Sequence, residues 1–419
     1  MYNKKTMSNT EPMFFRRRDL DVTRELIVAG LILFHTASIF GEFSFYVKNQ
    51  TPEPAVTFFI ILTSLWGIPL LFMIAGFAIW HSFDKRTRLE FLQERLLRLL
   101  IPFITGLVII VPPQLYYQLR SDAAYRESYM QFLPRFFDIT FSFNFPWFFS
   151  TSTTGNIFQP ANLWFLYILL VFTLLLFPVF LYLKQPSGQQ FIRRVASLIT
   201  TPWGLIMAAL PIAVIEAALG TDMAGGWNQN AYIVFLFYGF LLAADARFRQ
   251  AIRTYWKIGF VLAIVGSLGG IGGFSLIAES IHADPLKGYE LASVMLRFFK
   301  GLVGWCWMIA ILGFIEHARQ KRESASQFSK SNINTSNRTF LDGVERYANE
   351  AVLPFYILHQ TVIVIVAFYV VQWDFSALLK FFVIAMSALI ITLLLYEVVI
   401  KRTKATRFLF GMKSRAVYR

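Results

Sequence analysis

The chain has 419 residues, of which 56% are hydrophobic and only 15% are charged, and its formal net charge is +14. A soluble protein carries about 25% charged residues, so the composition excludes an ordinary soluble domain and indicates a chain that crosses the membrane many times. The Lys and Arg residues fall in short connections between apolar runs, which argues against a nucleic-acid partner despite the net charge.

Cys306 is the only cysteine, which excludes disulfides within the chain and cysteine-based metal clusters. No two histidines or carboxylates stand at ligand spacing on one apolar run, so we expect no bound metal. The first apolar run follows a polar N-terminal stretch and has no small-residue cleavage site, so we do not expect a cleaved signal peptide.

Apolar runs long enough to cross a bilayer recur along the whole chain. They predict an all-α, polytopic integral membrane protein with about ten transmembrane helices. The runs lie at 24–42, 57–80, 96–117, 163–183, 202–219, 230–245, 258–278, 291–315, 352–371 and 377–400.

The distribution of Lys and Arg predicts the orientation of these spans. If the N-terminus is cytoplasmic, the inside segments hold thirty of the 39 Lys and Arg residues and the outside loops hold five. A bias that alternates at every loop follows the positive-inside rule, so we expect both termini to be cytoplasmic.

Three regions follow from this topology: a cytoplasmic tail over 1–21, a membrane domain over 22–400 and a basic cytoplasmic tail over 401–419. Within the membrane domain, 118–162 is the longest outside loop, and we expect it to be periplasmic. Its many aromatic side chains either stack on sugar rings or form an interfacial belt. The Ser- and Asn-rich stretch 320–340 is typical of a flexible cytoplasmic linker.

Arg24 and His35 lie eleven residues apart on the first span. At about 100° per residue they share one helix face, roughly 16 Å apart. This spacing places Arg24 near the membrane surface and His35 near the bilayer centre. An ionisable side chain at that depth costs about 3 kcal/mol or more and usually lines a cavity. His35 is therefore the first candidate for chemistry inside the membrane.

His359 is a second ionisable residue within an apolar span. Its position in LPFYILHQTVI predicts a depth of about two helical turns from the cytoplasmic face. It either lines the same kind of cavity, which we favour, or is hydrogen bonded to a neighbouring helix.

Arg95 and Arg98 stand at i, i+3 at the cytoplasmic start of the third span, in RLLRLLIP. With Arg86 and Arg88 they predict a basic rim beside Arg24. The planar guanidinium suits a phosphate-bearing ligand that enters from the cytoplasm. The alternative is plain anchoring to anionic lipid.

Three further residues have both a functional and a packing interpretation. Asn162 and Trp164 open the fourth span from the outside and could meet an acceptor there, although an interfacial Trp is ordinarily an anchor. Gly76, in the second span, is typical of a close contact between two helices.

The segment LDVTRELIVAGLILFH resembles the first-helix signature of the membrane acyltransferase 3 family, in which an LDGLR-like segment precedes a histidine by eleven residues. Leu20, Asp21, Arg24 and His35 fall on that pattern, with Arg18 as the upstream arginine. PLLFMIAGF, RLLRLLIP, LWFL and YILH resemble further family motifs, in the same order. The ending LYEVVIKRTKATRFLFGMK is similar to the branch that adds succinyl groups to osmoregulated periplasmic glucans.

The resemblance implies transfer of an acetyl or succinyl group from cytoplasmic acyl-CoA to a hydroxyl of a periplasmic or cell-envelope glycan, by a protein of the inner membrane. Acyl-CoA is then a co-substrate, and no cofactor is bound permanently. Arg18, Arg24, Arg95 and Arg98 are expected to bind the donor, and Asn162 and Trp164 the acceptor. His35, ahead of His359, is expected to act as a general base or as a nucleophile.

Two observations limit what the resemblance implies about function. The WSLxxE motif of the lipopolysaccharide-acylating branch is replaced here by LWFLYIL, so no carboxylate role is carried over from it. A transporter or flippase of an anionic or glycan substrate would also use a histidine within the membrane and a basic rim. The absence of the internal repeat that builds many transporters argues against that alternative.

Overall fold

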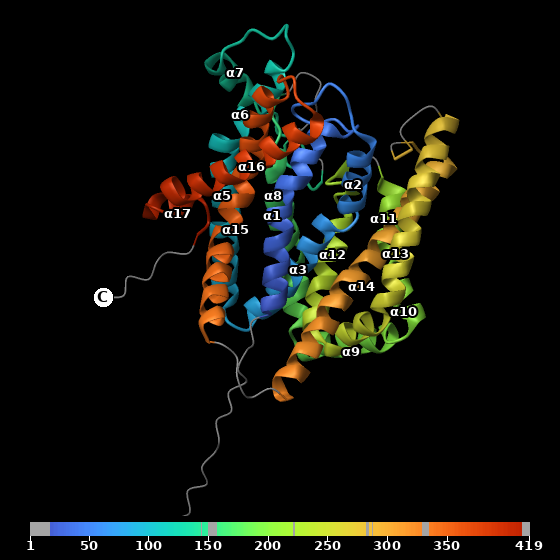
Figure 1. Ribbon diagram of the computed structural model, residues 1–419. Helices are drawn as coiled ribbons and strands as arrows, with labels where there is room; N and C mark the ends of the chain where they lie inside the picture. Colours follow the sequence, from blue (N-terminus) through green and yellow to red (C-terminus); the bar gives the residue numbers. More distant parts are fainter. Residues whose placement is uncertain are drawn as a thin grey trace, which may run out of the picture.

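The computed structural model describes residues 17–143, 145–149, 157–220, 223–281, 285–286, 288–328 and 335–412. Helices make up most of this part of the chain (Figure 1). Within it, nine helical segments are long and apolar enough to cross a membrane, and α12 is a shorter apolar helix of 14 residues. The prediction of an all-α polytopic membrane protein is confirmed.

The first half of the chain forms the following elements, of which η1 and η2 are π-helical and η3 is a 3₁₀ turn. They are α1 (Arg18–Phe40), α2 (Pro54–Ser64), α3 (Gly67–Phe83), α4 (Arg88–Arg95), η1 (Leu96–Leu100), α5 (Ile101–Thr105), η2 (Gly106–Ile110), α6 (Val111–Arg120), α7 (Tyr129–Phe136), η3 (Ala161–Leu163) and α8 (Trp164–Leu183).

The second half contains the two short antiparallel strands β1 and β2 and a π-helical segment, η4. Its elements are α9 (Pro186–Ile199), α10 (Pro202–Met207), α11 (Leu210–Leu219), β1 (Met223–Ala224), β2 (Trp227–Asn228), α12 (Ala231–Ala244), α13 (Ala246–Ile281), α14 (Leu291–Phe328), α15 (Thr335–Val370), α16 (Ala377–Leu395), η4 (Tyr396–Ile400) and α17 (Lys404–Leu409).

The two ends of the bundle carry different elements. α7 lies at one end, whereas α9, α10 and the neighbouring ends of α14 and α15 lie at the other (Figure 1). The charges assign 118–162 and 320–340 to opposite sides of the membrane, and that assignment stays a prediction. α1 begins at Arg18, upstream of the expected boundary at residue 22, because Asp19 and Asp21 in its first turn interact favourably with the helix dipole.

Helices extend into both ends of the 320–340 stretch, where the sequence predicts a flexible linker. α14 continues to Phe328 and α15 begins at Thr335, while residues 329–334 lie outside the described part of the chain. The segment HARQKRESASQF contains several strong helix formers, Ala, Arg, Gln, Lys and Glu, which explains why α14 extends so far.

α3 and α12 approach each other through two glycines. A Cβ atom added at Gly76 would lie 1.9 Å from the carbonyl oxygen of Leu236, and one added at Gly239 would lie 1.9 Å from that of Met73. The backbones can touch because neither residue has a side chain. This contact bears out the packing interpretation of Gly76 and holds α12 inside the bundle.

α15 is the most buried of the long apolar helices. Within its most apolar window 72% of the residues are buried, compared with 17% for α13, which lies at the edge of the bundle. Side chains on α15 therefore meet protein on most sides, and His359 lies on this helix.

Candidate active site

The structure brings the two candidate histidines together. The ring centroids of His35, on α1, and His359, on α15, are 5.2 Å apart. His359 is fully buried, whereas His35 is partly exposed and so borders accessible space. Phe45 stacks on His35 from another side, with its ring centroid 5.9 Å away.

The contacts of His359 determine which ring nitrogen carries its proton. Nδ1 lies 2.7 Å from the carbonyl oxygen of Tyr356 and 3.2 Å from that of Phe355. A carbonyl oxygen only accepts hydrogen bonds, so Nδ1 must be the donor in the neutral ring. Nε2 then presents a lone pair.

Each histidine has one buried ring nitrogen without a partner. Neither Nδ1 of His35 nor Nε2 of His359 has a hydrogen-bond partner among the residues that the structure describes. A buried polar atom left unpaired costs about 1–3 kcal/mol. Two of them on adjacent rings are typical of a site that completes its hydrogen bonds with a ligand.

Both histidines lie in the second half of their helices. His35 is five residues before the end of α1 at Phe40, about 8 Å along the axis, so it is nearer the C-terminal end of this helix than its middle. His359 comes 24 residues after the start of α15 at Thr335. The expected depth of His359, about two turns from the cytoplasmic face, stays a prediction, because α15 begins before the apolar segment Asp342–Val370 that could cross the membrane.

The connection from α1 to α2 folds back over His35. The backbone nitrogens of Asn49 and Glu53 donate to carbonyl oxygens near the end of α1, at 3.0 and 2.7 Å. Nζ of Lys48 donates to the carbonyl oxygens of Ser38 and Phe43, each at 2.9 Å. These bonds fix residues 41–53 so that Phe45 covers the histidine ring.

A buried cluster of amide and hydroxyl side chains joins α6, η3 and α15 behind His359. Nε2 of Gln114 donates to Oδ1 of Asn162 at 3.2 Å and to Oγ1 of Thr361 at 2.6 Å. Nε2 of Gln360 donates to Oε1 of Gln114 at 2.9 Å. We call these four residues the amide cluster; all are less than 9% exposed.

Asn162 belongs to this cluster and not to an open mouth. Its Nδ2 donates to the Tyr356 carbonyl oxygen at 2.9 Å, and the Tyr356 hydroxyl donates to the Asn162 carbonyl. The amide of Asn162 is thus hydrogen bonded within the protein. Trp164, also expected at the acceptor, packs on Tyr232 with centroids 5.5 Å apart, and no described ring contact joins it to a histidine.

Arg24 lies on the same face of α1 as His35, about three turns nearer the start of the helix. Its guanidinium donates to Oδ1 of Asn349 at 2.8 Å and lies 3.4 Å from the carboxylate of Asp21. Its Nε is nevertheless buried without a hydrogen-bond partner in the described part of the chain. Arg24 is also close enough to Arg98 for their charges to interact.

Arg95 and Arg98 both lie near Glu94, and they differ in their partners. Arg98 pairs with Glu94 at 3.5 Å, and Arg86 pairs with the same oxygen at 2.9 Å. The guanidinium of Arg95 lies over the ring of Phe91, 5.0 Å from its centroid, and its Nε has no hydrogen-bond partner among the described residues. Arg24, beside the rim, and Arg95, within it, thus each have one buried N–H donor with no acceptor in the described part of the chain.

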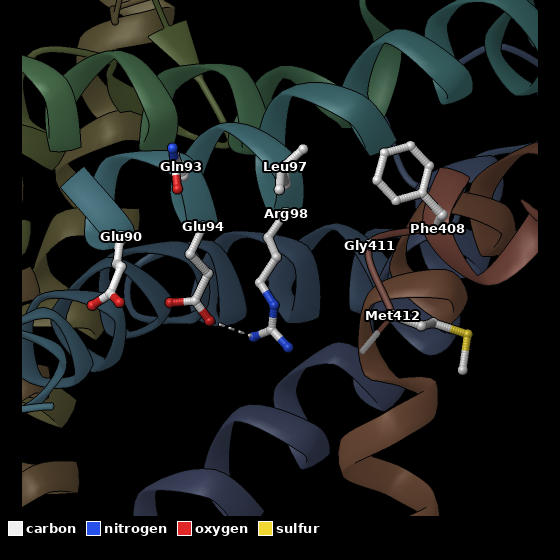
Figure 2. A pocket seen from close by; sticks show the side chains of 8 residues that line it. All are labelled: Glu90, Gln93, Glu94, Leu97, Arg98, Phe408, Gly411 and Met412. Atoms are coloured by element: carbon white, nitrogen blue, oxygen red, sulfur yellow. Dashed lines mark ion pairs between the residues drawn. The ribbon is translucent and has the colours of Figure 1, made fainter. Parts of the chain in front are cut away.

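Arg98 also lines a pocket of about 370 Å³ between the start of the third span and α17 (Figure 2). Figure 2 shows Glu90, Glu94 and Arg98 on one side and Phe408 and Met412 on the other. Pro102 cannot donate a helical hydrogen bond to the Arg98 carbonyl, which accounts for the π-helical turn η1 at this point.

Arg18 stands apart from the rim. Its guanidinium pairs with Asp342 at 2.8 Å and with Glu345, both on α15, and its side chain is 52% exposed. Arg17, which the sequence did not single out, donates to Glu316 on α14 at 2.9 Å. The two arginines thus fasten the start of α1 to different helices.

Sequence reasoning missed the amide cluster apart from Asn162. Gln114 is an uncharged amide inside an apolar span, in VPPQLYY, and Gln360 directly follows His359. A polar amide within a span usually bonds to another helix, and that signal could have identified both.

A family model described as an acyltransferase domain, Acyl_transf_3, matches residues 17–397 of the chain. The match begins at α1 and ends within η4, so it includes both histidines, the rim and the amide cluster. No curated protein and no solved structure matches this chain.

Proposed function

Because this chain belongs to the acyltransferase 3 family and is therefore a membrane-bound acyltransferase, we propose that it moves an acetyl or succinyl group from cytoplasmic acyl-CoA to a hydroxyl of a periplasmic or cell-envelope glycan. The observation that supports this most is the facing pair His35 and His359, each with a buried ring nitrogen that has no hydrogen-bond partner among the described residues. We propose the inner membrane as its location, with the basic rim on the cytoplasmic side.

The rim supplies the donor side of this proposal. The pyrophosphate of acyl-CoA would accept from the Nε groups of Arg24 and Arg95, which have no acceptor of their own among the described residues. The pocket beside Arg98 would take part of the nucleotide, whose phosphates would compete with Glu94 for the guanidinium. The pantetheine arm would then lead the thioester along α1 toward His35, roughly 16 Å away.

His35 performs the chemical step in this proposal because it is partly exposed and shares a helix face with Arg24. As a general base, it takes the proton of the acceptor hydroxyl while the hydroxyl oxygen attacks the thioester carbonyl carbon. The carbon–sulfur bond then breaks, and the imidazolium returns the proton to the departing thiolate. His359 offers a second lone pair beside this proton transfer.

The nucleophilic route uses the same atoms in two steps. A ring nitrogen of His35 attacks the thioester, the thiolate leaves, and an acyl-imidazole forms, which the glycan hydroxyl then cleaves. Incubation of the protein with donor alone distinguishes the two routes. Only the nucleophilic route should release one equivalent of thiol per protein in a burst when no acceptor is present.

The test of the proposed function is a reconstituted reaction. Purified protein is placed in vesicles that contain a soluble glucan, and acetyl- or succinyl-CoA labelled in the acyl group is added outside. We expect label esterified to the glucan, and none in protein-free vesicles. Passage of label or glucan across the membrane without a covalent change would contradict acyl transfer and favour a transporter.

A further inference from the structure

The carbonyl group of Tyr356 connects His359 to the amide cluster. It faces Nδ1 of His359 at 2.7 Å and accepts from Nδ2 of Asn162 at 2.9 Å. The same carbonyl oxygen therefore meets side-chain donors from two elements, α15 and η3. Asn162 therefore touches the atom that determines the tautomer of His359, although it makes no contact with the ring that the structure records.

Gln114 occupies the centre of the cluster. Its amide nitrogen bonds to Asn162 and to Thr361, and its amide oxygen accepts from Gln360. Thr361 in turn donates to the carbonyl oxygen of Ile110 at 2.7 Å, and Pro112 and Pro113, two and three residues further on, lack N–H groups. Both ends of the Gln114 amide are thus hydrogen bonded. The nitrogen reaches Asn162, which donates to the Tyr356 carbonyl, and the oxygen accepts from Gln360, which directly follows His359.

The cluster also reaches the segment between α1 and α2 that covers His35. The side chain of Gln360 interacts with the phenol of Tyr46, and burial raises the pKa of that phenol. Tyr46 packs edge-on against Phe45, with centroids 5.2 Å apart, and Phe45 stacks on His35. One set of contacts therefore holds His359 from behind and continues to the segment that covers His35.

We propose that Gln114 is a positioning residue, which together with Asn162 holds the Tyr356 carbonyl against Nδ1 of His359 so that Nε2 stays unprotonated beside His35. The role of that lone pair in acyl transfer rests on the proposed function. The positioning of the ring does not, because it follows from hydrogen bonds within the protein.

A purely structural cluster would also join α6 to α15, since amides bond helices together within membranes. The structural role and the positioning role predict different effects of a cluster mutation when His359 is also removed. A structural residue supports the whole bundle, so its loss lowers activity whether or not His359 is present. A residue that acts through His359 loses its effect once that ring is removed.

The first arm of the test is therefore a double-mutant cycle between Gln114→Met and His359→Ala. Thr361→Val is a milder change in the same cluster. Thr173→Val is its matched control, because Thr173 is buried on α8 and its hydroxyl has no hydrogen-bond partner among the described residues. The measured quantities are kcat and the KM for the donor.

We expect Gln114→Met to lower kcat about as much as His359→Ala does, with an unchanged KM for the donor. In the His359→Ala protein, Gln114→Met should change kcat by less than about twofold, which is the usual limit of additivity error. Thr361→Val should show the same pattern to a smaller degree, and Thr173→Val should resemble the parent. Losses that multiply in the double variant overturn the proposal.

The second arm does not depend on activity. Nitrogen NMR of protein labelled in its five histidines reports the tautomer of each ring, and His359→Ala identifies the resonance of His359. We expect the Nδ1–H form in the parent and in Thr173→Val, and a population of the Nε2–H form in Gln114→Met. A Gln114→Met protein with an unchanged His359 tautomer contradicts the positioning role, and this result stands even if no acyl transfer is found.

Discussion

His35 and His359 face each other with ring centroids 5.2 Å apart, one from the first membrane helix and one from α15, near the end of the chain. The contact makes one site from two histidines that lie far apart in sequence. The less buried histidine of the pair lies on α1, on the helix face that also carries Arg24.

The first prediction concerns the donor. Arg24→Ala and Arg95→Ala should each weaken acyl-CoA binding by at least about tenfold, because each removes a charge-assisted hydrogen bond to phosphate worth about 1.5–3 kcal/mol. Arg98→Ala should weaken it as well. Lys at each position should restore only part of the affinity, since it lacks the planar fork. Isothermal titration with a non-hydrolysable acyl-CoA analogue measures the effect.

Arg194→Ala is the control for these variants. Arg194 lies exposed on α9, at the same end of the bundle, and the variant changes the net charge by the same amount. Its affinity should equal that of the parent. If the Arg24, Arg95 and Arg98 variants all bind donor as tightly as the parent, these arginines do not bind the donor and only orient the chain in the membrane.

The second prediction concerns the contact between α3 and α12. Gly76→Ala should lower the free energy of unfolding by about 3 kcal/mol, because the new Cβ would collide with the backbone of Leu236. Gly30→Ala is the matched control: Gly30 lies within α1, and a Cβ there meets no atom within 4 Å. Thermal unfolding in detergent compares the two. A Gly76→Ala protein as stable as the control would show that the two helices separate without cost.

The third prediction concerns topology. In a Cys306→Ser background, cysteines at Ala123, before α7, and at Ser324, near the end of α14, should be labelled from opposite sides. We expect a membrane-impermeant maleimide to reach position 123 in intact cells and position 324 only after the membrane is opened. The reverse pattern would exchange the donor and acceptor sides.

Much of this fold follows from periodicity and charge. Runs such as 163–183 and 377–400 agree closely with α8 and with α16 and η4, because about twenty apolar residues have few alternatives to a membrane helix. The 320–340 stretch shows the limit of composition: its Ser and Asn residues indicated a linker, whereas local helix propensity extends α14 to Phe328.

The site was predictable only in part. Eleven-residue spacing on one helix places Arg24 below His35, and that needs no tertiary information. The meeting of His35 with His359 depends on how α1 packs against α15, which no local pattern encodes. Asn162 shows the same limit, since its position at the start of a span suggested an acceptor site, whereas its partners Gln114 and Tyr356 lie on other helices.

The central claim is that His35 performs the chemical step, and its removal tests this claim most directly. The measurement is the single-turnover rate of acyl transfer to the glucan by His35→Ala protein in vesicles, at saturating labelled donor. We expect this variant to insert and fold normally and to bind donor as the parent does. Its rate should fall by at least the ~10²-fold typical of losing a general base, and more than that of His359→Ala. A His35→Ala protein that transfers the acyl group at nearly the parental rate would contradict the account and assign the chemistry to His359.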